Sequence, residues 1–185
     1  MQFLKLTIPL IASILFLGCI AKSPKPPVAL VQIKETPTPD TVTLQAAINE
    51  LQILQIKLAD GTNYKTYAHL LKNTVPVIEN AKGDAKVLAA VESAFKGHQL
   101  ALEFWQCDRL NGYQELHQCR GKALSAIFAK YPDMKAEATA AIQGTDLSTL
   151  SAKLDKDQVL QTIWEKTTAD MEAARRTISI NTSRK

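Results

Sequence analysis

Apolar residues recur every three or four positions along most of the chain after residue 40, which is the period of an α-helix and not of a β-strand. Asp40 is placed to cap the first predicted helix, which ends at Asp60-Gly61. The apolar stripe of this helix consists of Leu44, Ala47, Leu51, Leu54 and Leu58. A second helix is predicted after Asn63, with one face made of Tyr64, Tyr67, Ala68, Leu71 and Val75. Pro76 either kinks this helix or begins another one, with Thr74 as the nearby cap.

The second half of the chain keeps the same period. After a break at 81–83, a long helix is predicted from Asp84 to about Leu110, with the inward positions Val87, Leu88, Val91, Phe95, Leu102 and Trp105. A helix over 113–130 follows the turn Asn111-Gly112 and buries Leu116, Ala123, Leu124, Ile127 and Phe128. Pro132 closes it.

Three shorter patterns complete the chain. Asp133 is expected to cap an alanine-rich helix that Gly144 stops, and residues 146–154 are expected to form a short helix or turn. The last helix is predicted to begin at Asp157. Its stripe consists of Leu160, Ile163, Trp164, Met171, Ala174 and Ile178. Together these elements predict one all-α domain over residues 41–178, a single bundle of about five to seven helices with a polar tail at 179–185.

The N-terminal residues carry a different signal. Lys5 precedes an apolar segment of the length found in signal peptides, and this segment closes on Leu15-Phe16-Leu17-Gly18-Cys19. The ending resembles the lipobox of bacterial lipoproteins. The resemblance implies that residues 1–18 are a signal peptide, removed before Cys19, and that Cys19 carries acyl chains such as palmitate. The alternatives are a membrane-spanning anchor, which the short run and Pro9 disfavour, and an ordinary secretory signal with an incidental cysteine.

Residues 19–40 are predicted to be a linker behind the lipidated cysteine. The segment holds Pro24, Pro26, Pro27, Pro37 and Pro39, and such a composition favours an extended, semi-rigid spacer. Ile20 stands where many lipoproteins of the inner membrane carry aspartate. We therefore expect the protein in the cell envelope, anchored in the bilayer through Cys19, at the outer membrane and facing the periplasm.

Two further cysteines flank the predicted turn Asn111-Gly112. Cys107 and Cys119 lie at similar distances on either side of it, so folding the two helices back as a hairpin brings them within range of a disulfide. An exported domain meets an oxidising compartment, which favours the bond. The alternative is two free thiols in a helical core.

The end of this hairpin holds the residues that we single out for partner contact: Trp105, Asp108, Arg109 and Tyr113. Glu103, Asp108, Arg109 and His117 also flank the turn, although at helical spacing such residues are more often a solvated face. His98 lies beside an apolar stripe and is read as a packed histidine.

A zinc site built from His98, Cys107, His117 and Cys119 is disfavoured. Residues two apart on a helix, such as His117 and Cys119, point to different sides, and the chain has no C-x-x-C pair. No metal and no cofactor are therefore expected.

Function is less well determined by the sequence. The net charge of +4 is spread without a basic run, which argues against nucleic-acid binding. No glycine-rich phosphate loop, G-x-S-x-G or H-E-x-x-H motif is present, so an enzyme is not expected. The sequence favours a helical module that binds or assembles an envelope protein. The alternative is a ligand-binding or inhibitor module. The combination of lipid anchor, helical domain and stapling disulfide resembles the pilotins of secretion systems in architecture only, since no pilotin motif is matched.

Overall fold

The computed structural model describes residues 39–183, with side chains as far as residue 178. The predicted signal peptide (1–18), Cys19 and nearly all of the linker lie outside the described residues. The described residues hold helices and no strand: α1 (Pro39–Ala59), α2 (Tyr64–Glu79), α3 (Ala85–Gln106), the 3-10 turn η1 (Cys107–Arg109), α4 (Tyr113–Lys130), α5 (Pro132–Ile142), α6 (Leu147–Lys153) and α7 (Lys156–Ser183). The predicted all-α fold is confirmed.

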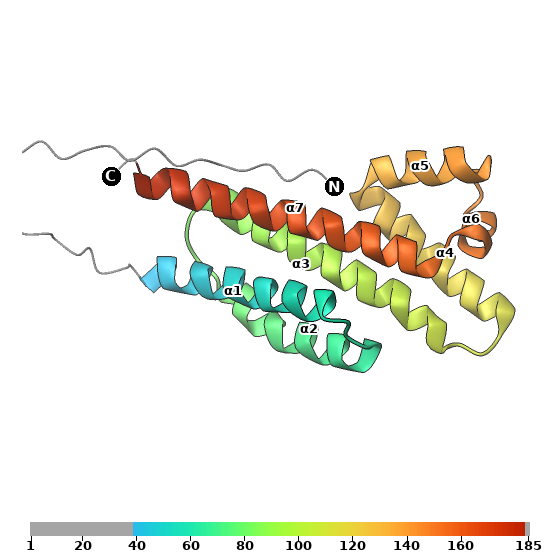
Figure 1. The fold of residues 1–185 in the computed structure, drawn as a ribbon, viewed down its shortest axis with the longest axis horizontal. Helices are drawn as coiled ribbons and strands as arrows, with labels where there is room; N and C mark the ends of the chain where they lie inside the picture. The colour runs from blue at the N-terminus through green and yellow to red at the C-terminus, as the bar shows by residue number, and fades with distance from the viewer. Residues whose placement is uncertain (1–38, 184–185) are drawn as a thin grey trace, which may run out of the picture. The chain divides into compact units, whose positions relative to one another are not determined.

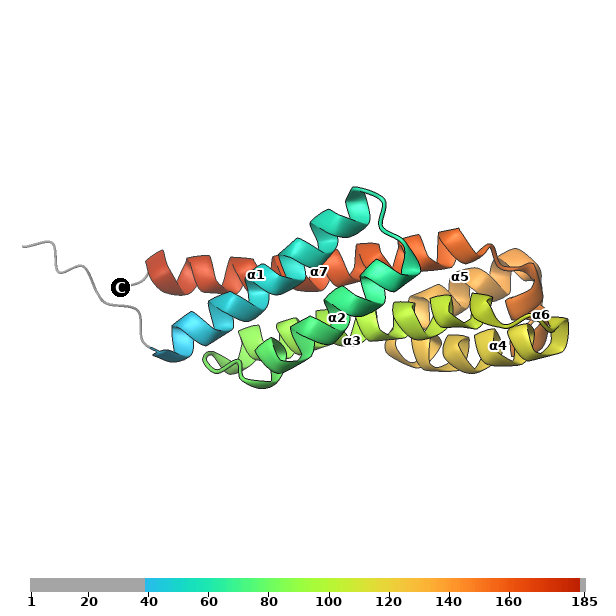
Figure 2. The same cartoon turned by 90° about the horizontal axis from the view of Figure 1, so that it is seen from below.

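Two long helices, α3 and α7, form the most extensive contact between elements of this helical unit and run antiparallel (Figure 1). The hairpin of α1 and α2 packs beside the half of this pair that holds the start of α3 (Figures 1 and 2). Helices α4, α5 and α6 gather at the opposite end, where α3 finishes and α7 begins. The α3–α7 pair is therefore the element against which the rest of the unit is placed.

Side-chain caps fix several of the predicted boundaries. Asn63, Asp84 and Asp146 each accept a hydrogen bond from a backbone N–H in the first turn of the helix that follows. Pro76 does not begin a new helix, because α2 continues through it to Glu79. The Thr74 hydroxyl is not a cap and donates to the Leu70 carbonyl at 3.0 Å instead.

Several boundaries differ from the prediction. Helix α1 begins at Pro39, so Asp40 lies in its first turn and is not its cap. Helix α7 begins at Lys156, so Asp157 also lies inside the helix. Helix α5 begins at Pro132, so Asp133 lies in its first turn and is not its cap; proline suits this position because the N–H that it lacks has no acceptor there. Helix α3 ends at Gln106, and η1 covers the next three residues. Helix α7 continues past residue 178 to Ser183, since no glycine or proline interrupts that stretch.

The core confirms most of the predicted stripes and corrects the one on α3. Leu88, Leu102 and Trp105 are only half-buried. The buried positions that the prediction missed on this helix are Ala94, Gly97, Leu100, Ala101 and Phe104, whereas His98 is buried as expected. The reason is that α3 contacts α1, α2, α4 and α7, so it is covered on more than one face and a single stripe does not describe it.

Gly97 is a position where α3 lies very close to α7 and to Tyr131. A Cβ atom at this position would overlap the methyl group of Thr167 on α7 and the hydroxyl of Tyr131, which follows α4. Thr167 is fully buried. Glycine is thus required here by space, although it lowers the intrinsic stability of a helix interior.

We predict that Gly97→Ala destabilises the unit by about 1–3 kcal/mol, because the added methyl group forces α7 or Tyr131 to shift. The measurement is the free energy of unfolding in urea. Gly144→Ala is the control, since a Cβ there would lie 4.0 Å from its nearest neighbour, a Thr149 methyl group. Equal stability of the two variants would show that the α3–α7 contact is not tight at Gly97.

Candidate functional site

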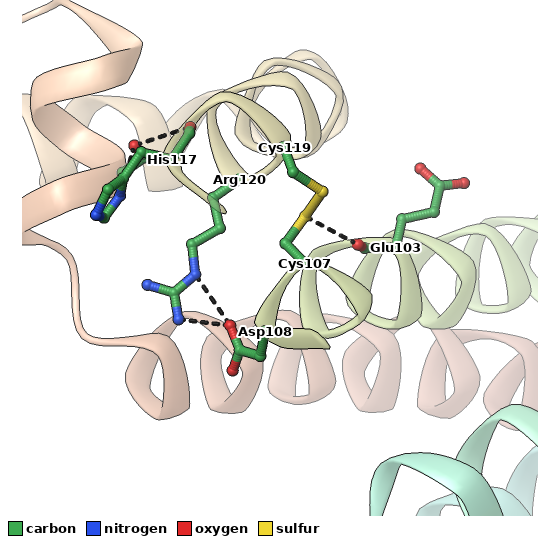
Figure 3. The surroundings of a disulfide bond; sticks show 7 residues. Glu103, Cys107, Asp108, His117, Cys119 and Arg120 are labelled. Carbon is green, nitrogen blue, oxygen red and sulfur yellow. Dashed lines mark hydrogen bonds and ion pairs between the residues drawn. A yellow bond between two sulfur atoms is a disulfide. The ribbon is translucent and has the colours of Figure 1, made fainter. Parts of the chain in front are cut away.

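The hairpin between α3 and α4 is closed by a disulfide. Cys107 and Cys119 are joined with a Cα–Cα distance of 5.6 Å (Figure 3). The predicted pairing is confirmed. Cys107 is fully buried, and its sulfur lies 3.5 Å from the Glu103 carbonyl oxygen. This is a contact only, because a disulfide sulfur has no proton to donate. The bond fixes the start of η1 against the second turn of α4.

An ion-pair network holds the same hairpin to α7. The Arg120 guanidinium donates to Asp108 Oδ1 through two nitrogens, at 2.6 and 3.1 Å (Figure 3). Lys156, at the start of α7, lies 3.6 Å from the other oxygen of Asp108. Its hydrogen bond to Asp157 is the main cause that raises the pKa of Lys156. Asp108 therefore joins α4 and α7.

A groove of about 480 Å³ runs over the disulfide. Its lining residues come from the end of α3, from η1 and from α4: Glu103, Gln106, Cys107, Arg109, Leu110, Cys119, Lys122, Ala123 and Ala126. Alanine side chains and the disulfide give it a shallow floor. Leu110 is 43% exposed beside it. We call this feature the staple groove.

Two of the other predicted contact residues, Trp105 and Arg109, both lie against Tyr64 of α2. Trp105 is half-buried and packs edge-on against Tyr64 and Trp164, with ring centroids about 6 Å apart. Arg109 lies over the face of Tyr64, with its guanidinium 5.2 Å from the centre of the ring. These contacts place Trp105 and Arg109 toward α2.

Tyr113 lies on another side of the hairpin. It is 72% exposed and packs edge-on against His117, with 4.3 Å between ring centroids. The fully buried Ser151 of α6 hydrogen-bonds the His117 carbonyl at 3.1 Å. The four residues that the sequence singles out therefore do not form one surface, and only Arg109 lines the staple groove. The groove residues Leu110 and Lys122 were missed, since neither belongs to a motif.

A second polar site, in the interior, was also missed. The Tyr67 hydroxyl lies 3.0 Å from His98 Nδ1 and 3.1 Å from the His98 carbonyl, and it accepts from Trp164 Nε1 at 3.3 Å. His98 Nε2 is buried and has no hydrogen-bond partner. Burial lowers the pKa of His98 to about 4 and raises that of Tyr67 above its usual range. These three side chains are uncharged, and their hydrogen bonds connect α2, α3 and α7.

Ser93, Lys130 and Asp170 form a third cluster, between α3, α4 and α7. Lys130 donates to the Ser93 hydroxyl at 2.7 Å, and that hydroxyl donates to Asp170 at 2.7 Å. Burial is the main cause that lowers the pKa of Lys130. The serine proton is directed at the carboxylate and not at the lysine, so Lys130 does not act as its base. The cluster is a bridged ion pair.

Within residues 39–183, no three His, Cys, Asp or Glu side chains gather so that they could hold a metal ion. The cysteines of the zinc alternative are oxidised. None of the described helices is long and apolar enough to cross a membrane.

Comparison with known proteins adds no relative: the chain matches no protein-family model, no curated protein and no solved structure.

We predict that Cys107→Ser with Cys119→Ser lowers the free energy of unfolding by about 3 kcal/mol, the loop-closure value for a crosslink of this length. Most of the helix signal in circular dichroism should persist, since the hairpin also has its ion pairs. Non-reducing digestion and mass spectrometry should find the linked peptides in exported wild-type protein. Two free, alkylatable thiols would contradict the staple.

We predict that His98 makes the unit sensitive to acid. Its pKa is depressed in the fold from the ordinary 6.5 to about 4, so the neutral form is favoured by folding. This contribution is complete above about pH 6.5 and is lost as the pH falls toward 4, by about 3 kcal/mol in all. His98→Gln, which does not titrate, should show a flatter decline of unfolding free energy over this range. An unchanged slope would contradict the assignment.

Proposed function

We propose that this protein is a lipid-anchored module of the bacterial cell envelope that docks or assembles another envelope protein. Its localisation is supported by the lipobox-like ending at Cys19 and by the disulfide between Cys107 and Cys119, because such bonds persist in oxidising compartments. On this proposal residues 1–18 are removed, and the helical unit stands off the outer membrane behind its proline-rich linker.

The staple groove is the single observation that carries the docking proposal. It combines an exposed apolar side chain, Leu110, with a floor of small residues that lets another chain approach closely. The disulfide and the Asp108–Arg120 pair already fix the hairpin that carries it, so little conformational entropy is lost on binding. The charged residues that line it are Arg109 and Lys122, which are positive, and Glu103, which is negative, so the lining has a net positive charge. The proposed occupant is an apolar segment of an envelope protein that carries acidic residues.

An enzymatic role has less support. Ser93 accepts a hydrogen bond from Lys130, but its hydroxyl donates to Asp170 within a bridged ion pair. A ligand-binding role, the second candidate function, is favoured by a separate cavity of about 270 Å³ between α1 and α7, which Trp164 and Glu165 help to line.

We predict that Cys19→Ala abolishes labelling with radioactive palmitate and stops the protein from fractionating with the outer membrane. The reason is that acylation needs the thiol, and two or more acyl chains supply the membrane affinity. Cys119→Ser is the matched control, since it removes a cysteine without touching the lipid site. Membrane association that survives Cys19→Ala would contradict the anchor.

We predict that a photo-crosslinker at Lys122 in the full-length protein captures an envelope protein in living cells. Leu110→Asp should abolish the product, because it places a buried charge in the interface. Val42→Asp is the control, since Val42 is an exposed apolar residue of similar size on α1, at 54% against 43% for Leu110. A product that is unaffected by Leu110→Asp, or lost equally with Val42→Asp, would contradict docking at the staple groove.

A further inference from the structure

Helix α1 carries a second row of apolar side chains, on the side away from the core. The helix lies on the outside of the unit, with α7 behind it (Figure 2). Val42, Ile53 and Ile56 are 54%, 44% and 51% exposed, and Ala46 between them is exposed as well. These three make up most of the large apolar side chains that stay exposed in the part of the chain that the structure describes. Such a contiguous row indicates an interaction surface.

The row follows the spacing of a short coiled coil. Its members are Val42, Ala46, Asn49, Ile53 and Ile56, at successive intervals of four, three, four and three residues. This is the seven-residue repeat by which one helix packs along another. Every member is exposed, and the buried residues of α1 lie on the other side of the helix. The spacing therefore points to a helix as the occupant of this row, which we call the outer stripe.

Asn49, in the middle of the outer stripe, favours a second copy of this chain as that helix. Under an ordinary apolar helix its amide would be buried without a hydrogen-bond partner, which destabilises an interface. An antiparallel copy would place Ala46 or Ile53 opposite it. A parallel copy in register places Asn49 opposite Asn49, so the two amides can bond each other. Gln45 donates to Asn49 Oδ1 at 2.9 Å, which leaves the amide nitrogen as the donor for this bond.

The residues beside the outer stripe permit the same arrangement. In a parallel pair, Gln45 of one copy lies near Glu50 of the other, and Gln52 lies near Lys57. No two like charges are brought together, and each glutamine amide can form a hydrogen bond with the charged group that it meets. The stripe itself holds no charged residue.

The chain ahead of α1 also favours parallel copies. Residues 20–38 join Cys19, the proposed lipid anchor, to Pro39, the first residue of α1. Copies anchored in one bilayer therefore begin their α1 helices from the same side. With three large apolar side chains on each copy, the interface lies at or below the low end of stable complexes, roughly 1,200 Å². Pairing is thus expected to depend on the local concentration that anchoring supplies.

We propose that α1 pairs with α1 of a second copy along the outer stripe, parallel and in register, so that the protein forms a dimer at the membrane. The pairing itself follows from the spacing and from Asn49, and only its dependence on the membrane rests on the lipid anchor of the proposed function. The outer stripe shares no residue with the staple groove, so pairing and docking stand independently.

The test places single cysteines in the full-length protein in the cell. The hairpin disulfide and, on the proposed function, the acylation of Cys19 leave no other free thiol. Val42→Cys and Ile56→Cys should each give a disulfide-linked dimer on a non-reducing gel, because a parallel pair sets each position opposite itself. An antiparallel pair would link neither, since it sets the two positions at opposite ends. Lys57→Cys is the matched control, being exposed and adjacent but off the stripe.

A charged residue in the stripe tests the interface itself. Ile53→Asp, added to Val42→Cys, should lower the dimer yield about tenfold or more, because it buries two like charges against each other. Circular dichroism should show an unchanged helix content, since Ile53 is exposed in the single copy. Lys72→Asp, which places the same residue at an exposed position of α2, should leave the dimer yield unchanged.

The outcomes separate the pair from the anchor. In protein that carries palmitate, the pair is overturned if Val42→Cys or Ile56→Cys gives no more dimer than Lys57→Cys, as expected if the apolar residues 28–33 of the same chain cover the stripe. It is also overturned if both cysteines link to a different protein. In either case the anchor stands. Wild-type protein without palmitate would contradict the anchor, and the same crosslinks in a Cys19→Ala background would then decide the pair.

Discussion

The close antiparallel packing of α3 against α7 is the constraint on which the rest of the structure depends. It requires Gly97, because Thr167 and Tyr131 occupy the space of a side chain there. The same pairing sets Ser93 opposite Asp170 and brings Asp108 near Lys156, two contacts at widely separated points of the two helices. Once this register is fixed, α1 and α2 have one end of the pair to cover and α4 to α6 have the other (Figure 1).

Two kinds of interaction support the end of the pair where α3 finishes and α7 begins. On the side of α4, a disulfide and the Asp108–Arg120 pair hold the hairpin. On the side of α2, the rings of Tyr64, Tyr67, Trp105 and Trp164 pack with one another. Trp105 and Cys107 are two residues apart in the chain, so the end of α3 carries both kinds of support. The staple groove lies on the side of the disulfide.

Local pattern predicted the helices well, because capping and period are properties of neighbouring residues. Asn63 caps α2 as expected, the long helix begins directly after Asp84, and the disulfide follows from the turn between its cysteines. The sites were less predictable, because they join residues distant in sequence. No pattern in the residues around Gln55 predicts that it lines a cavity with Trp164, and none around His98 predicts its hydrogen bond with Tyr67. On α3, which is covered on several faces, a one-stripe interpretation left Leu100 and Phe104 out of the core.

Close packing leaves three buried polar atoms without hydrogen-bond partners in the part of the chain that the structure describes: Gln55 Nε2, His98 Nε2 and the Tyr131 hydroxyl. The Tyr131 ring packs in the core beside Gly97. His98 is fully buried and bonds Tyr67 through its other nitrogen. An aliphatic residue at either position would lose this packing or this hydrogen bond, so the unpaired atom accompanies a structural contribution of the same side chain. Gln55 contributes no ring to the core, and its side chain lines the cavity between α1 and α7.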